Sequence, residues 1–267
     1  MLGGLFPVRS GAEEILSQIS DGYKPRVLDI GTGSGAWAIE VAIRYPNVEV
    51  LGLDLAPVNP SSTPPSNCLF ETGDASAGLQ RYGRFDVIQA RSVLQGIQDY
   101  AALCADVAQV LNPRGVFISL EADAGLYDKN KVKYGPQKKG DPDFSWSHEL
   151  TTAYNEATSK RNPGFSNLTK VAEILGKEVG EPWGTIEETT FFVPFGPYEN
   201  GDEKERIAGR FMHQSVLKFP KTLQVLLLAS GYDAEYVNRL SEMALDEIKN
   251  CSVINYVKQM LARQFDT

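Results

Sequence analysis

Short apolar runs alternate with amphipathic segments over the first 121 residues of the chain. The runs have the length and the Val, Leu and Ile content of buried strands, and they lie at 26–30, 48–54, 69–74, 85–90 and 115–121. Because helix-like or loop segments separate these runs, the pattern predicts a parallel sheet that helices cover on both faces.

Helix boundaries can be assigned from caps and prolines. Ser10 and Glu13 have the spacing of a capping box, which predicts a helix at 10–20. The helix at 36–45 must end before Pro46, because the residue that precedes proline avoids helical geometry. A further helix ends at Asn112-Pro113, and its buried face is formed by Leu103, Val107, Val110 and Leu111.

The pattern becomes looser and more aromatic after residue 122. We expect helices near 148–160, 167–179, 203–230 and 234–249, and strands at 185–195 and 252–261. In the second of these helices the predicted cap is Ser166. A chain of 267 residues suits one elaborated domain. We expect a core at about 10–121 and 185–267, and a lid at about 122–184.

Composition and charge exclude several classes of partner. Asp and Glu number 34 and Lys and Arg 26, so the formal charge is −8. Such a field repels nucleic acid and anionic lipid, and no apolar run reaches the ~20 residues that span a bilayer. Three widely spaced cysteines lack metal-ligand spacing and indicate a reducing compartment. We therefore expect a cytoplasmic or nuclear protein that holds no metal.

A glycine-rich loop follows the first predicted strand and precedes the first long helix. Gly31, Gly33 and Gly35 fit the G-x-G-x-x-A pattern of a dinucleotide site and also the D-x-G-x-G-x-G pattern of an S-adenosylmethionine (SAM) site. The acid two residues before the first glycine separates the two readings. An ionised Asp29 opposes a pyrophosphate at this turn, whereas it attracts the ammonium and sulfonium groups of SAM.

Two more acids lie at the ends of the next strands. Asp54 follows the second strand, where a carboxylate can accept both ribose hydroxyls. Asp74 follows the third strand and is placed to receive the exocyclic amine of adenine. Acids at the carboxyl ends of neighbouring parallel strands line the crevice in which open sheets bind ligands. The combined pattern favours SAM.

Tyr127 and Lys131 raise a competing interpretation. Their Tyr-x-x-x-Lys spacing occurs in short-chain dehydrogenases, in which the lysine lowers the pKa of the phenol. Those enzymes also carry a TGxxxGxG loop, whereas this chain reads GTGSGAWA. We interpret the spacing as a coincidence, and a dehydrogenase remains the third hypothesis.

The glycine loop, the segment DLAPVNPSSTPPSNCLFETGDA and the segment FDVIQARSVL resemble class I SAM-dependent methyltransferases of the fungal secondary-metabolism type related to LaeA. The resemblance implies an α/β fold with a Rossmann-like, seven-stranded, mainly parallel sheet and a helical, aromatic lid inserted after the fifth strand. It also implies SAM as cofactor and S-adenosylhomocysteine as product. The implied cofactor residues are Asp29, Gly31, Thr32, Gly33, Gly35, Asp54, Leu55, Asp74, Ala75, Ala90 and Arg91.

The acceptor and the base are left open by the sequence. Many related O-methyltransferases place a histidine just past the fourth strand, where this chain has Gln95, which cannot act as a base. The candidates for proton transfer are therefore His148, His213 and Glu121, with Asp123 beside the last. A carboxylate acceptor needs no base, and Arg91 or the lysines at 129–139 would then orient it.

The aromatic content after residue 122 suggests an apolar acceptor pocket. We expect a small aromatic or terpenoid acceptor that is methylated on oxygen, with contacts from Gln95, Tyr127, Trp146 and Trp183. The rival hypothesis is a regulatory SAM-binding protein that acts through a protein partner. A homodimer is also compatible with the sequence.

Overall fold

The computed structural model describes most of the chain, and the description below refers to these residues only. They are residues 4–6, 11–18, 22–135, 137–141, 144–162, 171–175, 185–194, 196, 201–250 and 256–265. The chain divides into two compact units. The sheet unit comprises mainly residues 2–121 with 167–189 and 260–267, and the helical unit comprises mainly 122–166 and 190–259.

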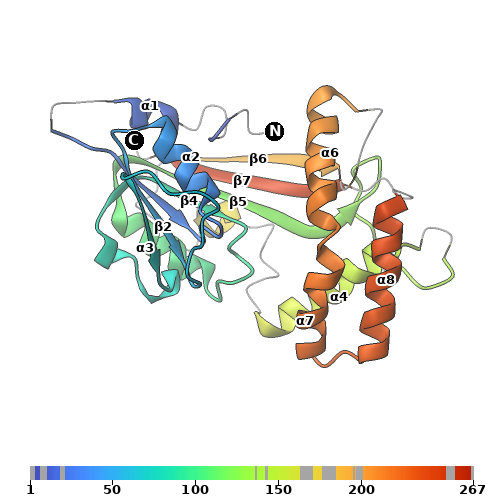
Figure 1. Cartoon of the computed structure of the whole chain (residues 1–267). Coiled ribbons are helices and arrows are strands. Elements are labelled where there is room, and N and C mark those ends of the chain that lie inside the picture. Colours follow the sequence, from blue (N-terminus) through green and yellow to red (C-terminus); the bar gives the residue numbers. More distant parts are fainter. Residues whose placement is uncertain are drawn as a thin grey trace. The chain divides into compact units, whose positions relative to one another are not determined.

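Five parallel strands form the centre of the sheet unit (Figure 1). Their hydrogen-bonded order is β3-β2-β1-β4-β5, and it continues to β7 and then β6. This order confirms the predicted parallel sheet. The five strands are β1 (Arg26–Ile30), β2 (Glu49–Asp54), β3 (Cys68–Thr72), β4 (Phe85–Arg91) and β5 (Leu111–Tyr127).

The helices that flank the sheet are close to the predicted ones. They are α1 (Ala12–Ser17), α2 (Ala36–Arg44) and α3 (Tyr100–Val110), with two 3₁₀ turns, η1 (Ala75–Ala77) and η2 (Gln80–Tyr82). The predicted capping box before α1 is wrong, since the cap residue is Gly11 and no side chain caps this end. The helix α3 does begin with a side-chain cap, because Asp99 accepts a hydrogen bond from the backbone of Ala102 at 2.9 Å.

The core of the sheet unit is mainly apolar. The central strands contribute side chains that are almost completely buried, among them Leu28, Ile30, Leu53, Phe85, Ile88 and Phe117. Burial of side chains of this size stabilises a fold by roughly 1.5–3 kcal/mol each. The near-continuous apolar runs of the sequence are explained by this burial on both faces of the sheet.

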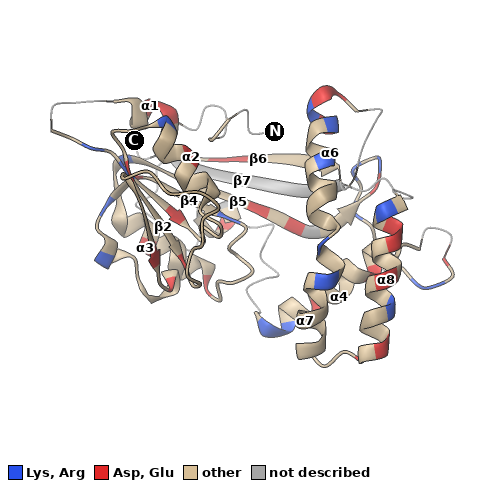
Figure 2. Ribbon diagram, in the orientation of Figure 1, with Lys and Arg blue, Asp and Glu red and all other residues tan. Residues whose placement is uncertain are grey.

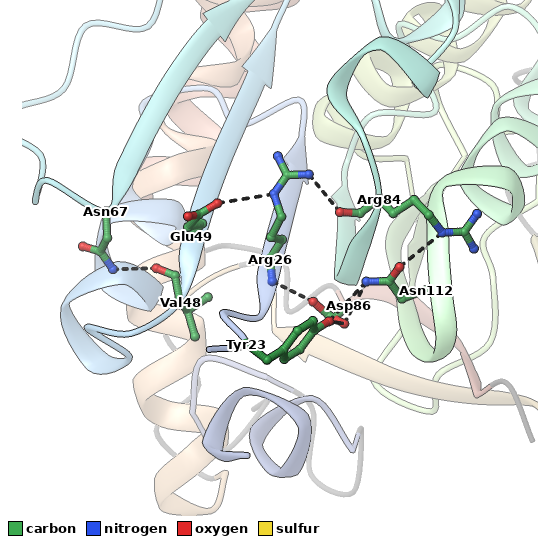
Figure 3. A network of polar contacts seen from close by, with 8 residues as sticks. All are labelled: Tyr23, Arg26, Val48, Glu49, Asn67, Arg84, Asp86 and Asn112. Atoms are coloured by element: carbon green, nitrogen blue, oxygen red, sulfur yellow. Dashed lines mark hydrogen bonds and ion pairs between the residues drawn. The ribbon is translucent and has the colours of Figure 1, made fainter. Parts of the chain in front are cut away.

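A polar network closes the amino end of the sheet (Figure 3). The buried carboxylate of Asp86 accepts hydrogen bonds from the Arg26 backbone at 2.7 Å, from the Asn112 side chain at 2.9 Å, and from the Tyr23 hydroxyl. Burial, and then the contact with Asp86, raise the pKa of Tyr23 to about 12. This end of β1, β4 and β5 is therefore joined by side chains as well as by the strand ladder.

The helical unit has its own core. Its helices are α4 (Trp146–Arg161), α6 (Glu203–Val216), α7 (Phe219–Ala229) and α8 (Ala234–Asn250). Buried side chains from α4, α7 and α8 pack together, and they are Leu150, Ala153, Ala157, Leu223, Leu227, Val237, Leu240 and Ala244. This grouping differs from the expected division, in which residues 185–267 belonged with the cofactor-binding core.

Several elements differ in extent from the prediction. The strand β5 continues to Tyr127, six residues beyond the predicted end, and crosses the boundary between the units at 121/122. Of the helix expected at 167–179, the structure describes α5 (Val171–Glu173), while the proposed cap Ser166 lies outside the described residues. The last strands are β6 (Thr185–Pro194) and β7 (Tyr256–Phe265). None of the described helices combines the length and the apolar character that crossing a bilayer demands.

Candidate functional site

A cavity of about 310 Å³ opens at the carboxyl ends of the parallel strands, within the sheet unit. This is the edge at which open α/β sheets bind their ligands. Its wall contains the predicted residues Gly31, Asp54, Leu55, Asp74, Ala75 and Gln95, together with Ile30, Leu53, Gly73, Ser92, Val93, Gly96 and Ile97. The structure thus brings together residues from four separate segments of the chain.

The glycine loop turns tightly between β1 and α2. Gly31, Gly33 and Gly35 have φ angles of 68°, 59° and 75°, a region that side chains rarely adopt. A β-carbon on Gly31 would lie 2.4 Å from Val93 Cγ1, and one on Gly35 would lie 2.5 Å from Phe70 Cζ. At Gly33 a β-carbon would meet no atom within 4 Å. The first and third glycines therefore permit close packing, and the second leaves an open surface.

Asp29 is buried beneath this loop, with 3% of its surface exposed. Its carboxylate accepts a hydrogen bond from the Thr32 hydroxyl at 2.6 Å. Burial raises the pKa of Asp29 to about 6, while the Thr32 hydrogen bond and the charge of Arg91 oppose the rise. At neutral pH the group is therefore mostly ionised, and it presents a negative charge in a region of low polarity.

Asp54 connects the end of β2 to the glycine loop. One carboxylate oxygen accepts from the Gly33 backbone at 2.8 Å, and the other accepts from the Ala56 backbone at 3.0 Å. Each carboxylate oxygen has two lone pairs, so both keep capacity for a ligand donor. Asp74 plays a similar double role, since it caps η1 through the Ser76 backbone at 2.8 Å and also lines the cavity.

Glu121 binds the backbone of the segment that contains the lining residue Val93. Its Oε1 accepts from the backbone of Val93 at 3.0 Å and of Leu94 at 3.4 Å, and the side chain is 1% exposed. Its Oε2 has no hydrogen-bond partner among the described residues. Burial raises the pKa of Glu121 to about 7, against the effect of the two backbone hydrogen bonds. The contact positions the backbone of Val93 and Leu94, and a role of Glu121 in proton transfer stays a prediction.

Six of the implied cofactor residues are not part of the cavity wall, and they are Asp29, Thr32, Gly33, Gly35, Ala90 and Arg91. Ala90 is completely buried in β4, and its contact with the cofactor stays a prediction. Arg91, the last residue of β4, is exposed and acts on Asp29 through its charge. Ser92 then has a φ of 56°, which turns the chain toward Val93 and the cavity. The sequence did not predict that Ser92, Val93, Gly96 and Ile97 line the cavity, because no sequence motif indicates a positive φ at a serine.

The candidate base His148 lies in the first turn of α4, in the helical unit. It is 8% exposed and its ring packs edge-on against Tyr134 with centroids 5.6 Å apart. Burial lowers the pKa of His148, although a backbone hydrogen bond with Gly135 and the charge of Glu149 oppose the change. Its Nδ1 has no hydrogen-bond partner in the part of the chain that the structure describes. The ring is therefore neutral at physiological pH.

Tyr127 does not have the surroundings of a dehydrogenase phenol. Its hydroxyl donates to Asp123, and burial followed by this contact raises the pKa of Tyr127 above its usual range. The lysine that reaches Asp123 is Lys133, at 3.0 Å, whereas Lys131 lies over the Phe192 ring at 5.6 Å. These contacts agree with the interpretation that the Tyr-x-x-x-Lys spacing of Tyr127 and Lys131 is a coincidence.

The remaining candidates are distributed over the helical unit and beyond. His213 is in α6, and its Nδ1 is buried without a hydrogen-bond partner among the described residues. Trp146 is the first residue of α4. Trp183 lies outside the described residues. The part of the chain that is described contains no cluster of three or more metal-ligating side chains.

Comparison with known proteins gives a consistent set of relatives. Residues 8–157 match the family described as "Methyltransferase domain". The chain is 48% identical over 252 residues to the secondary metabolism regulator laeA of Aspergillus flavus, covering 90% of this chain and 65% of that protein. It is 32% identical over 174 residues to the methyltransferase str2 of Strobilurus tenacellus, covering 65% of this chain and 63% of that protein. The chain thus spans less than two thirds of either relative.

A solved structure shares the fold. The phosphoethanolamine N-methyltransferase 2 of Haemonchus contortus, in complex with phosphomonomethylethanolamine and S-adenosylhomocysteine, superposes with a TM-score of 0.50 at 14% identity. The alignment covers 96% of this chain and 51% of that protein. At this identity the likeness concerns the fold alone, and it agrees with the five-stranded parallel sheet described above.

Proposed function

The chain belongs to the methyltransferase domain family, as its glycine loop predicts, and from this premise we propose that it transfers a methyl group from SAM to a small molecule. The single observation that carries the proposal is the cavity at the carboxyl ends of the strands, where Asp54 and Asp74 line the wall beside the glycine turn. S-Adenosylhomocysteine is the corresponding product.

The residues of the cavity fit this cofactor by charge and by shape. Asp29 and Asp54 favour a ligand that carries an ammonium and a sulfonium group, and they oppose a pyrophosphate. The missing β-carbons at Gly31 and Gly35 allow Val93 and Phe70 to pack against the loop. We assign the ribose hydroxyls to Asp54, the adenine edge to Asp74 and Ala75, and the methionine portion to the loop from Asp29 to Gly35.

Methyl transfer places few chemical demands on the protein. The bound cofactor supplies an electrophilic methyl group, which leaves the sulfonium by an in-line displacement. The protein contributes alignment and exclusion of water. Ile30, Leu53, Val93 and Ile97 give the cavity apolar surface, and Glu121 fixes the backbone of Val93 and Leu94.

We propose His148 as the base for an acceptor that arrives protonated. Burial lowers the pKa of His148, which keeps the ring in the neutral state that proton removal from a phenol or enol requires. This supports methylation on oxygen. Replacement of His148 by Gln should lower kcat by 10²-fold or more for a phenolic acceptor and should leave S-adenosylhomocysteine affinity unchanged.

We also propose how the remaining strands, the lid and the acceptor contacts are arranged. We propose that β6 and β7 complete a seven-stranded sheet and that the segment after β5 forms a lid of one methyltransferase domain; the strand order supports the first point. We assign acceptor contacts to Gln95, Tyr127, Trp146 and Trp183. The acidic composition and three cysteines support a cytoplasmic or nuclear location.

A second function has a specific observation in its favour. The relative that is 48% identical is named a secondary metabolism regulator rather than by a reaction. A regulatory chain would bind SAM and a protein partner without turning over a metabolite. Labelled-methyl transfer to fungal extract fractions, compared with co-purification of a stoichiometric protein, distinguishes the two. A labelled metabolite supports the enzyme, and a stable complex without any labelled product supports the regulator.

The cofactor assignment is tested by thermal unfolding with added ligand. S-Adenosylhomocysteine at about 100 times its Kd should raise Tm by roughly 5–10 °C, because a ligand that binds only the folded state adds about 2.7 kcal/mol. NADPH should give no rise. The variant Asp54→Ala should lose the rise, whereas Glu71→Gln, an exposed carboxylate at the end of β3 that does not line the cavity, should keep it. Stabilisation by NADPH would overturn the assignment.

A further inference from the structure

A second cavity, of about 420 Å³, lies within the helical unit. It is formed by the segment that leads into α4, by the first turn of α4 and by the first turns of α8. The lining residues are Gln137, Lys138, Lys139, Phe144, Trp146, Glu149, Tyr236, Arg239 and Leu240. Cavities of this size hold small organic ligands. Of these lining residues, the methyl-transfer proposal uses Trp146 alone, as an acceptor contact.

Aromatic rings form one part of its wall. Phe144 and Trp146 meet edge to face, with ring centroids 5.1 Å apart and planes at 85°. Trp146 is half-buried and packs against the apolar core of the helical unit, so its position is fixed. Tyr236 stands on α8, and its hydroxyl donates to Glu149 at 2.7 Å. The wall therefore offers rigid, flat surfaces for a planar ligand.

Cations converge on the same ring. Lys139 Nζ lies 5.5 Å from the centroid of Trp146, and the guanidinium carbon of Arg239 lies 6.0 Å from it. Within the part of the chain that the structure describes, neither side chain forms an ion pair. Each of the two cations lies close to the ring that lines the cavity, where it can pair with the charged end of a bound anion.

The wall of this cavity has an excess of positive charge, whereas the whole chain has an excess of negative charge. Lys138, Lys139 and Arg239 contribute three positive charges and Glu149 one negative charge, while the whole chain carries −8. Glu149 keeps its negative charge while it accepts the Tyr236 hydroxyl, so three positive charges and one negative charge leave the lining with a formal charge of +2. Figure 2 shows Lys and Arg as well as Asp and Glu along α8, and the local excess of positive charge arises from Arg239 together with the lysines of the segment before α4.

We propose that this cavity binds an aromatic carboxylic acid. The ring of the ligand lies against Trp146 and Phe144, and its carboxylate pairs with Arg239 and Lys139. The planar, forked guanidinium of Arg239 suits a carboxylate, since it can donate two parallel hydrogen bonds. The proposal does not depend on the cofactor assignment.

The test is isothermal titration calorimetry of the intact chain with 2-naphthoate as probe. We expect one binding site per chain, an affinity that falls at least threefold when NaCl is raised from 0.05 to 0.5 M, and at least tenfold weaker binding of the neutral 2-naphthamide. Cyclohexanecarboxylate has the charge without the aromatic face, and it should also bind at least threefold more weakly. Absence of naphthoate binding, or equal affinity for the acid and the amide, would overturn the proposal.

Variants at exposed positions locate the site. Arg239→Gln should weaken naphthoate binding at least tenfold and Lys139→Gln at least threefold, because both remove a charge that faces Trp146. Lys160→Gln is the matched control, since Lys160 also lies over a ring, that of Tyr232 at 5.8 Å, but does not line the cavity. It should bind naphthoate as the unmodified chain does. Equal losses in Arg239→Gln and Lys160→Gln would contradict the site. S-Adenosylhomocysteine affinity, measured on the same samples, reports separately on the cofactor proposal.

Discussion

The two ends of the same parallel sheet bury carboxylates in opposite ways. At the amino end, Asp86 receives three donors, so its charge is fully compensated (Figure 3). At the carboxyl end, Asp29 accepts a hydrogen bond from the Thr32 hydroxyl, and Glu121 leaves one oxygen without a partner among the described residues. The pKa values of Asp29 and Glu121 are raised to about 6 and about 7, chiefly by burial.

This difference separates residues that hold the fold from residues that hold a ligand. A buried charge with its hydrogen bonds complete stabilises the structure around it, whereas an incompletely paired one is costly unless a further partner binds. Incomplete pairing next to a cavity is therefore a physical indication of a binding site. The amino end should respond to mutation through stability, and the carboxyl end mainly through affinity.

The largest effect is expected at the amino end. Asp86→Ala removes the acceptor of three hydrogen bonds and leaves the Arg26 backbone N–H without its side-chain acceptor. The free energy of unfolding should fall by about 3 kcal/mol, as measured by urea titration. The affinity for S-adenosylhomocysteine should remain within twofold. A tenfold loss of affinity in the folded variant would abolish the distinction between the two ends.

The glycine turn is expected to lose both stability and affinity. Gly31→Ala places a β-carbon 2.4 Å from Val93 Cγ1 at a φ of 68°, so we expect a loss of about 2–3 kcal/mol and a cavity wall displaced at Val93. Gly33→Ala is the control, because its φ is also positive but no atom lies within 4 Å, and it should cost about 1 kcal/mol. Equal losses of stability in the two variants would show that packing against Val93 is unimportant.

Asp29 should show a trade between stability and binding. Its raised pKa means that the favourable effect of the protonated form is complete below about pH 3.8 and is lost as the pH rises through about 6. Asp29→Asn should therefore raise the unfolding free energy at pH 8 by about 1–2 kcal/mol and weaken S-adenosylhomocysteine binding about tenfold. Urea titrations at pH 5 and pH 8 measure the first effect. A variant that is less stable at pH 8 would contradict it.

Glu121 should give the smallest effect. Glutamine keeps an oxygen for the backbone of Val93, so Glu121→Gln should change stability by less than about 1 kcal/mol at pH 7. The stabilising effect of the protonated acid is present below about pH 4.5 and is lost as the pH rises through about 7. The variant should therefore flatten the dependence of Tm on pH between 5 and 7. An unchanged slope would mean that Glu121 does not titrate in this range.

The sheet was predictable from the sequence because it depends on local patterns. The first three central strands contain apolar runs, and a glycine or an acid at or directly after the end of each strand marks the carboxyl edge. The positions of Asp54 and Asp74 followed from strand order alone. The cap of α1 was not predictable, because the sequence offers a favourable capping box at Ser10, whereas the residue at the cap position is Gly11.

The contacts that shape the site depend on the tertiary fold. Glu121 meets Val93 and Leu94 across 28 and 27 residues, and a positive φ at Ser92 makes the contact possible. The role of Asp86 could not be predicted from the segment FDVIQA. Its three hydrogen-bond donors are distant in the sequence, in β1, in β5 and at Tyr23. The cation pair over Trp146 joins α8 to a segment about 100 residues earlier. The hydrophobic periodicity of a sequence gives no information on contacts between residues so far apart.

The most direct test of the central claim compares two isosteric changes at opposite ends of the sheet. Calorimetric titration with S-adenosylhomocysteine would be performed on the unmodified chain, on Asp54→Asn and on Asp86→Asn. The account predicts at least 30-fold weaker binding for Asp54→Asn and an affinity within twofold for Asp86→Asn, although the latter unfolds at a lower temperature. Equal losses in both variants, or no binding to the unmodified chain, would contradict it.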